Sequence, residues 1–215
     1  MKEDKMTLFS DEEKDILQEV MNIAFGNATA DLAEVIDIFV VLTVPQIQVM
    51  KISELPTYFE KNIHGFERIW KLDQEFWGDF SGSGFLIFPE QIGKSLVELF
   101  GTGDLDPTEN NPFDSLEKEI LLEVGNILVG ACVGKIAELL DTRVTYSPPI
   151  ASQGECSNFA RLVENYDSDQ TAIIMKTVFE FENHNISGLL FFITSQDSIE
   201  WLKKSLYDYL ESFDE

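Results

Sequence analysis

Apolar residues recur at helical spacing near the start of the chain, at Leu17, Met21, Ala24 and Ala28. Steps of three and four residues place these side chains on one side of an α-helix, so the pattern predicts an amphipathic helix anchored on a core. The same periodicity closes each half of the chain, first at Ile92, Leu96 and Leu99 and later at Ile199, Leu202 and Leu206. We expect a further helix at each of these two places.

Two sequence signals predict where the first helix of each half begins. Ser10 followed by Glu13 fits a capping box, in which the hydroxyl and the carboxylate satisfy backbone N–H groups at a helix start. Asp114 followed by Glu117 is the corresponding signal for the second half. We therefore expect one helix to start after Ser10 and another to start after Asp114.

Runs rich in β-branched and aromatic residues lie between these helices and predict strands. They are residues 38–44, 47–52, 67–72 and 84–88 in the first half, and residues 160–166, 171–182 and 188–192 in the second. The strands are not each followed by a crossover helix, so the order favours an α+β fold, a mainly antiparallel sheet with helices packed on it.

The chain also repeats itself. Residues 19–45 align with residues 123–149 without a gap, and Gly84 and Gly188 continue the same alignment. The matching positions include Glu19, Asn22, Gly26 and Pro45, which recur as Glu123, Asn126, Gly130 and Pro149. We predict a single domain, residues 1–215, made of two repeats (about 10–102 and 114–212) that are joined by the loop 103–113. The repeats are expected to share one sheet with pseudo-two-fold symmetry.

A row of polar and small residues runs along the predicted first helix, at Asp15, Glu19, Asn22 and Gly26. At about 100° per residue these positions share one narrow face. Taken singly, each has an ordinary explanation, since Glu is common on helix surfaces, Asn can face solvent and Gly can let a strand approach. Asn and Gly are nevertheless less favourable than Ala inside a helix by up to about 0.7 and 1 kcal/mol respectively. Both predicted helices carry both residues.

The spacing of Asp15, Glu19, Asn22 and Pro45 resembles the signature of the CheC, CheX and FliY phosphatases of bacterial chemotaxis. Glu119, Glu123, Asn126 and Pro149 repeat that spacing in the second half. The resemblance covers both halves, and two copies of the motif are similar to CheC. The chain departs from the family pattern at Glu119, where the family has Asp or Ser, but it keeps the Glu and Asn of the motif at Glu123 and Asn126.

The resemblance implies hydrolysis of the aspartyl phosphate of a CheY-like response regulator, which ends the chemotaxis signal. Asn22 and Asn126 would orient the attacking water, and Glu19 and Glu123 would contact a lysine of the receiver. The receiver would supply Mg²⁺, so no cofactor of the chain's own is expected.

The remaining motif positions would support these residues. Gly26 and Gly130 would let the partner surface approach, and Pro45 and Pro149 would fix the backbone beside each helix. Asp15 would support the helix or the partner contact, with no chemical role, and Glu119 takes its place in the second copy.

Two other classes of function stay open at this point. The protein could be a module that binds and sequesters the phosphorylated receiver, or one that regulates the receptor deamidase CheD, which CheC-like proteins also bind. It could instead be a structural interaction protein whose Asn rows contact another fixed partner. Decay of the receiver's phosphate separates these classes, because only a phosphatase accelerates it.

The composition of the chain limits which classes of partner it can bind. The chain has 39 acidic and 15 basic residues, a net charge of −24, which disfavours nucleic acids and anionic lipid surfaces. We see no apolar run approaching the roughly 20 residues that span a bilayer, and no signal peptide, so we expect a cytoplasmic protein without membrane insertion. Cys132 and Cys156 predict neither a disulfide framework nor a zinc site. His64 and His184 lie in polar, loop-like sequence and are expected at the surface.

Overall fold

The computed structural model describes residues 10–36, 39–62, 67–100, 112–155, 168, 170–182, 184, 186–194 and 197–211. The helices within these ranges are α1 (Asp11–Ile36), α2 (Leu55–Asn62), α3 (Ile92–Phe100), α4 (Pro112–Leu139) and α5 (Asp197–Glu211), with a short 3-10 turn at Ile52–Glu54. The strands are β1 (Val40–Leu42), β2 (Gln46–Lys51), β3 (Arg68–Gly78), β4 (Gly82–Pro89), β5 (Val144–Tyr146), β6 (Ile150–Glu155), β7 (Thr171–Phe181) and β8 (Ile186–Thr194).

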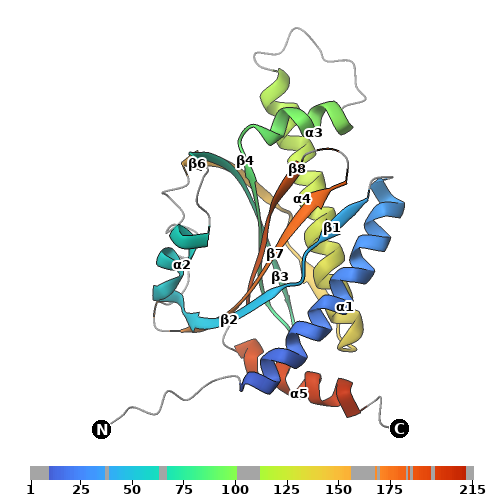
Figure 1. The fold of residues 1–215 in the computed structure, drawn as a ribbon, viewed down its shortest axis with the longest axis vertical. Helices are drawn as coiled ribbons and strands as arrows, with labels where there is room; N and C mark the ends of the chain where they lie inside the picture. The colour runs from blue at the N-terminus through green and yellow to red at the C-terminus, as the bar shows by residue number, and fades with distance from the viewer. Residues whose placement is uncertain are drawn as a thin grey trace.

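All eight of these strands form one antiparallel sheet, which confirms the predicted α+β class. The strand order is β1-β7-β8-β4-β3-β5, with β2 also paired to β7 and β6 also paired to β3. Figure 1 shows the sheet between α2 on one side and the adjoining helices α1 and α4 on the other, with α3 and α5 at opposite ends. The sheet therefore carries helices on both faces.

The strand pairing links the two halves of the sequence. The edge strands β1 and β2 pair with β7 of the second half, while β5 and β6 pair with β3 of the first. In the central pair β4 and β8, Leu86 lies opposite Leu190, its counterpart in the sequence alignment. This pairing is the one that a two-fold axis through the centre of the sheet requires, although the duplication itself stays a prediction.

Each face of the sheet has its own apolar core because alternate side chains of a strand point to opposite faces. In β4, Leu86 and Phe88 pack under α1 and α4, whereas Phe85 and Ile87 pack under α2. Since both faces are covered, β4 and β8 are almost continuously hydrophobic.

The predicted capping box at the start of α1 is confirmed. The Ser10 backbone N–H donates to Glu13 Oε2 at 2.6 Å, and the Glu13 backbone N–H donates to Ser10 Oγ at 3.1 Å. The carboxylate also pairs with Lys203 Nζ of α5 at 3.1 Å. One local motif therefore starts the first helix and ties it to the last.

The prediction for the start of the second helix was wrong. Helix α4 already begins at Pro112, so Asp114 lies within the helix and is not its cap, and the loop ends before residue 113. Proline suits the first helical position because the N–H it lacks has no acceptor there. The rest of the predicted linker, residues 103–111, falls outside the described residues.

Several strand predictions needed correction. The run 38–44 contributes only the three residues of β1, and 67–72 extends to Gly78. Strands β5 and β6 and helix α2 were not predicted. Strand β5 has strand-forming residues but is only three residues long, and β6 is largely polar, so both take their conformation from pairing with β3. The predicted strand 160–166 lies outside the described residues.

Helix α4 is more apolar than we expected. Its stretch Leu116–Leu139 is long and apolar enough, by length and composition alone, to cross a membrane, and half of an 18-residue window within it is buried inside the protein. The exposed acids Glu119 and Glu123 interrupt the stretch in the sequence. Its buried residues, such as Leu128 and Val133, belong to the core beneath the helix layer.

Candidate functional site

The two predicted rows lie on the outer surface of the helix layer. In α1, the side opposite the row packs on the sheet, where Leu17, Met21, Ala24 and Ala28 are fully buried. The row itself, Asp15, Glu19, Asn22 and Gly26, is exposed. On α4, Glu119, Glu123 and Asn126 are likewise exposed and Gly130 is half-buried. Because α1 and α4 adjoin on the same face of the sheet (Figure 1), both rows belong to one layer.

The glycines of the rows do not serve packing within the described part of the chain. A Cβ built on Gly26 or Gly130 would meet no atom within 4 Å. Gly125 is different, since a Cβ there would lie 2.4 Å from the Leu72 side chain. Among the described residues, Gly26 and Gly130 thus leave open surface, and close approach of a strand does not explain them.

The acids of both rows are unengaged. The side chains of Glu19 and Glu123 make no hydrogen bond or ion pair with any residue that the structure describes. The same holds for the side chains of Asp15 and Glu119. Neither does Asn22 have a hydrogen-bond partner in the described ranges. These side chains are free to meet another molecule.

Asn126 differs from Asn22, because its carboxamide belongs to a polar network. Gln74 of β3, which is 2% exposed, donates from Nε2 to Asn126 Oδ1 at 2.8 Å and to the Ser147 carbonyl oxygen at 3.0 Å. Ser147 Oγ in turn accepts from the Glu75 backbone N–H at 3.0 Å. The network ties the motif residue to the segment between β5 and β6.

Pro45 and Pro149 each lie at an interruption of an edge strand. Between the pairs Leu42–Phe179 and Gln46–Lys176, the edge strand has one residue more than β7. The same excess occurs between the pairs Tyr146–Phe76 and Ile150–Asp73. An extra residue bends a strand, and Pro is suited to such a position because it has no N–H to offer the ladder.

Tyr146 connects β5 to the glycine of the second row. Its hydroxyl donates to the Gly130 carbonyl oxygen at 3.3 Å. Burial raises the pKa of Tyr146 to about 12, so the hydroxyl keeps its proton at neutral pH. Burial also raises the pKa of Cys132, which keeps that cysteine a thiol as well.

Sequence reasoning did not find Gln74, Tyr146 or Ser147. Gln74 carried a usable signal, because it falls between Leu72 and Phe76 on the core-facing side of β3, where an amide needs hydrogen-bond partners. Of the other singled-out residues, His184 is exposed as expected, while His64 and Cys156 lie outside the described residues.

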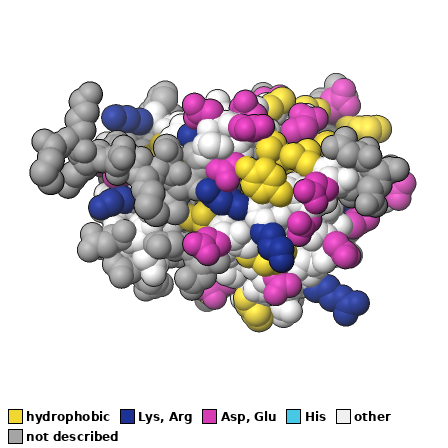
Figure 2. Space-filling model, turned by 90° about the horizontal axis from the view of Figure 1, so that it is seen from below, with side chains coloured by type: hydrophobic (Ala, Val, Ile, Leu, Met, Phe, Trp, Pro, Cys, Tyr) yellow, Lys and Arg dark blue, Asp and Glu magenta, His cyan; other side chains and the backbone are white. Residues whose placement is uncertain are grey.

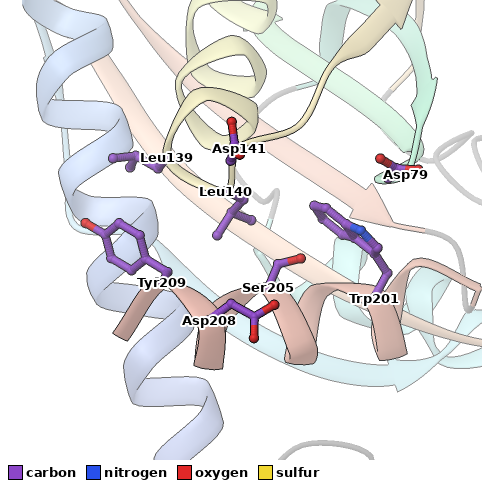
Figure 3. A pocket seen from close by; sticks show the side chains of 8 residues that line it. All are labelled: Asp79, Leu139, Leu140, Asp141, Trp201, Ser205, Asp208 and Tyr209. Atoms are coloured by element: carbon purple, nitrogen blue, oxygen red, sulfur yellow. The ribbon is translucent and has the colours of Figure 1, made fainter. Parts of the chain in front are cut away.

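A pocket of about 430 Å³ opens between α5 and the end of α4 (Figure 3). Its lining is Asp79, Leu139, Leu140, Asp141, Trp201, Ser205, Asp208 and Tyr209. None of these residues belongs to the rows, and three carboxylates repel a phosphoryl group. The face seen from below, in Figure 2, also carries more acidic than basic side chains. The pocket therefore does not suit the phosphate chemistry that the rows suggest.

Among the described residues, no group of three His, Cys, Asp or Glu side chains is arranged to hold a metal ion. What the rows can offer chemically is a pair of groups on adjacent helical turns, a carboxylate and a carboxamide, on a rigid support. A carboxylate attracts a cation, and a carboxamide can donate and accept hydrogen bonds at once. Such a pair can complete another molecule's reactive centre.

Comparison with solved structures defines the class of fold. The chain matches Thermotoga maritima FliY with a TM-score of 0.71 and 18% identity, covering 94% of this chain and 98% of that one. It also matches FliM in the FliM–SpeE complex from H. pylori, with a TM-score of 0.59 and 11% identity over 94% and 97% of the two chains. The fold is thus the one that FliY and FliM share.

Comparison with protein sequences finds a more specific similarity. The chain is 28% identical over 212 residues to a protein named CheY-P phosphatase CheC from Bacillus subtilis (strain 168), covering 92% of this chain and 96% of that protein. No family model matches the chain. The chain is therefore similar in sequence to a CheC protein and shares the fold of FliY.

Proposed function

We propose that this protein is a phosphatase that hydrolyses the aspartyl phosphate of a phosphorylated CheY-like response regulator and so ends a chemotaxis signal. The observation that carries the proposal is the pair of exposed rows, Glu19 with Asn22 and Glu123 with Asn126, on two adjoining helices. The similarity to a protein named CheY-P phosphatase CheC supports the same substrate.

Each row performs two tasks in this proposal. The carboxylate of Glu19 or Glu123 pairs with the receiver's lysine and orients the docked receiver. The carboxamide of Asn22 or Asn126 lies one turn further along and holds a water in line with the phosphorus atom. The water forms the new P–O bond, the P–O bond to the receiver's aspartate breaks, and free phosphate leaves.

The chemistry needs little else from this chain. Phosphoryl transfer proceeds through a loose transition state, so positioning and charge neutralisation account for most of the acceleration. The Mg²⁺ that neutralises the phosphoryl oxygens belongs to the receiver in this proposal. Gly26 and Gly130 leave the helix surface low enough for the receiver's backbone to approach, and Asp15 and Glu119 border the contact.

The proposal is tested by following the decay of aspartyl phosphate on a purified chemotaxis receiver with Mg²⁺, with and without this protein. We expect faster decay with the protein, and we expect Asn22→Ala together with Asn126→Ala to lower the acceleration by about 10²-fold. Each single variant should keep part of the activity, which measures the contribution of the other row. Asn27→Ala is the matched control, because Asn27 is an exposed asparagine of α1 outside the row.

Two outcomes would overturn the proposal and indicate a different class of function. Slower decay in the presence of the protein would indicate a module that sequesters the phosphorylated receiver. Unchanged decay across several receivers would indicate an interaction protein, and binding to the deamidase CheD would then be measured with the same Asn variants.

A further inference from the structure

Gln74 holds one motif asparagine in a defined orientation. Its Nε2 group contacts both Asn126 Oδ1 and the Ser147 carbonyl oxygen. A backbone carbonyl only accepts hydrogen bonds, so the Gln74 atom beside it must be the NH₂ group, and the Asn126 atom that shares this donor must be the oxygen. The Asn126 Nδ2 group is therefore the end of the carboxamide that is left for another molecule.

The corresponding contact is missing at Asn22. Thr177 of β7 takes the place of Gln74, since it is also 2% exposed and its Oγ1 donates to the Thr43 carbonyl oxygen at 2.6 Å, just as Gln74 donates to Ser147. No hydrogen bond joins Thr177 to Asn22 in the described part of the chain, and Asn22 has no other partner there. The two carboxamides are thus supported differently.

An amide side chain at the buried position 74 lowers the stability of the protein. Gln74 Oε1 is buried and has no hydrogen-bond partner among the described residues, and an unsatisfied buried acceptor lowers stability. An apolar side chain would avoid that penalty, since the neighbouring core-facing residues Leu72 and Phe76 are apolar. The NH₂ group, which makes two hydrogen bonds, is the part of Gln74 that only an amide of this length supplies.

We propose that Gln74 is a positioning residue of the α4 site, which fixes Asn126 with its NH₂ group outward and makes this site preorganised, whereas the α1 site must order Asn22 when the receiver docks. This inference rests on the proposed phosphatase function. A fixed side chain loses less rotamer freedom in the complex. The α4 site should therefore turn over about two- to tenfold faster than the α1 site.

The test uses the full chain carrying Asn22→Ala, in which only the α4 site remains. Adding Gln74→Met keeps the side-chain length and removes both hydrogen bonds. We expect kcat to fall about three- to tenfold while KM for the phosphorylated receiver changes less than twofold, because Glu123 still docks the receiver. Adding Gln74→Glu should give a similar fall, since a carboxylate cannot donate to Asn126 Oδ1.

Two controls separate positioning from a merely structural effect. In the chain carrying Asn126→Ala, Gln74→Met should leave the remaining activity unchanged, because Gln74 acts through Asn126. In the Asn126→Ala chain, Thr177→Val removes the hydrogen bond from Thr177 to the Thr43 carbonyl oxygen. Because Thr177 makes no hydrogen bond to Asn22 in the described residues, the rate of phosphate decay should also stay unchanged. An unchanged kcat with Gln74→Met in the Asn22→Ala chain, or an equal fall in the Asn126→Ala chain, would overturn the inference.

A second readout does not depend on phosphatase activity. NMR order parameters of the side-chain NH₂ groups should be higher for Asn126 than for Asn22, and Gln74→Met should lower the Asn126 value to that of Asn22. Equal values for both asparagines in the unsubstituted protein would refute the positioning role. A receiver phosphate that decays no faster with the protein would refute the proposed function alone.

Discussion

At the scale of single residues, the row on α1 holds side chains that the protein's own fold does not use. The side chains of Glu19 and Asn22 make no hydrogen bond with the described residues, and a Cβ at Gly26 would meet no atom within 4 Å. Asn and Gly both lower helix stability relative to Ala. Residues that weaken a helix without serving its packing are best explained by what the helix presents to a partner.

Gly26→Ala should change stability and activity in opposite directions. A Cβ at this position meets no atom within 4 Å, so we expect a gain of about 1 kcal/mol in the free energy of unfolding, from helix propensity alone. The added methyl should raise KM for the phosphorylated receiver about tenfold by holding the two surfaces apart. Urea titration and phosphate-release kinetics measure the two effects.

Asn27→Ala is the comparison for that variant, since it also improves helix propensity at an exposed position of α1 but lies away from the row. It should stabilise the protein by up to about 0.7 kcal/mol with no change in KM. If Gly26→Ala proved as active as Asn27→Ala, the glycine would have no part in docking.

At the scale of elements, helix α1 is set by signals at its start and by its packing. The Glu13 carboxylate is partly desolvated, which raises its pKa, but hydrogen bonds from Ser10 and Lys203 outweigh this effect and lower the pKa below 4.5. Since the folded-state value is below the unfolded one, this group stabilises the protein above the unfolded pKa, and the contribution is lost as pH falls through the folded pKa.

Glu13→Gln keeps a capping side chain and removes only its charge. We expect a loss of about 1 kcal/mol at pH 7, from the helix dipole and the Lys203 contact. The difference from the unsubstituted protein should shrink as pH falls through the lowered folded-state pKa of Glu13. Thermal unfolding between pH 3 and 8 measures it, and a loss of the same size at every pH would contradict the assignment. Asp11→Asn is the control, because the Asp11 carboxylate is 99% exposed and should contribute little.

At the scale of the whole molecule, strands of both sequence halves are combined in one sheet, in the order β1-β7-β8-β4-β3-β5. The central pair β4 and β8 joins the halves, and the edge strands of each half pair with the other. The motif helices of both halves lie side by side on this common sheet. We therefore expect the two helices to unfold together with this sheet.

The substitutions Leu86→Ala and Leu190→Ala test whether the two halves unfold in one transition. Both leucines are fully buried and lie opposite each other, so each substitution should lower the free energy of unfolding by about 2–5 kcal/mol. Because the sheet is shared, either change should shift one unfolding transition as a whole, seen alike by circular dichroism and Trp fluorescence. Two separate transitions, with only one shifted by each variant, would show that the halves unfold independently.

The sequence by itself determined the features that depend on local order. Helical spacing at Leu17, Met21 and Ala24 located α1, the Ser10–Glu13 pair located its start, and the α+β class followed from the order of helices and strands. Row residues such as Glu19 and Asn22 were found in the same way, because one helix fixes which of its positions share a face.

Only the tertiary structure decided what depends on residues distant in the chain. Strands β5 and β6 exist through pairing with β3, since β5 is only three residues long and β6 is largely polar, so neither sequence indicates a strand alone. The contact of Gln74 with Asn126 joins a strand of one half to a helix of the other. Which side chain supports which asparagine follows from how the sheet brings these elements together, and no local pattern contains that information.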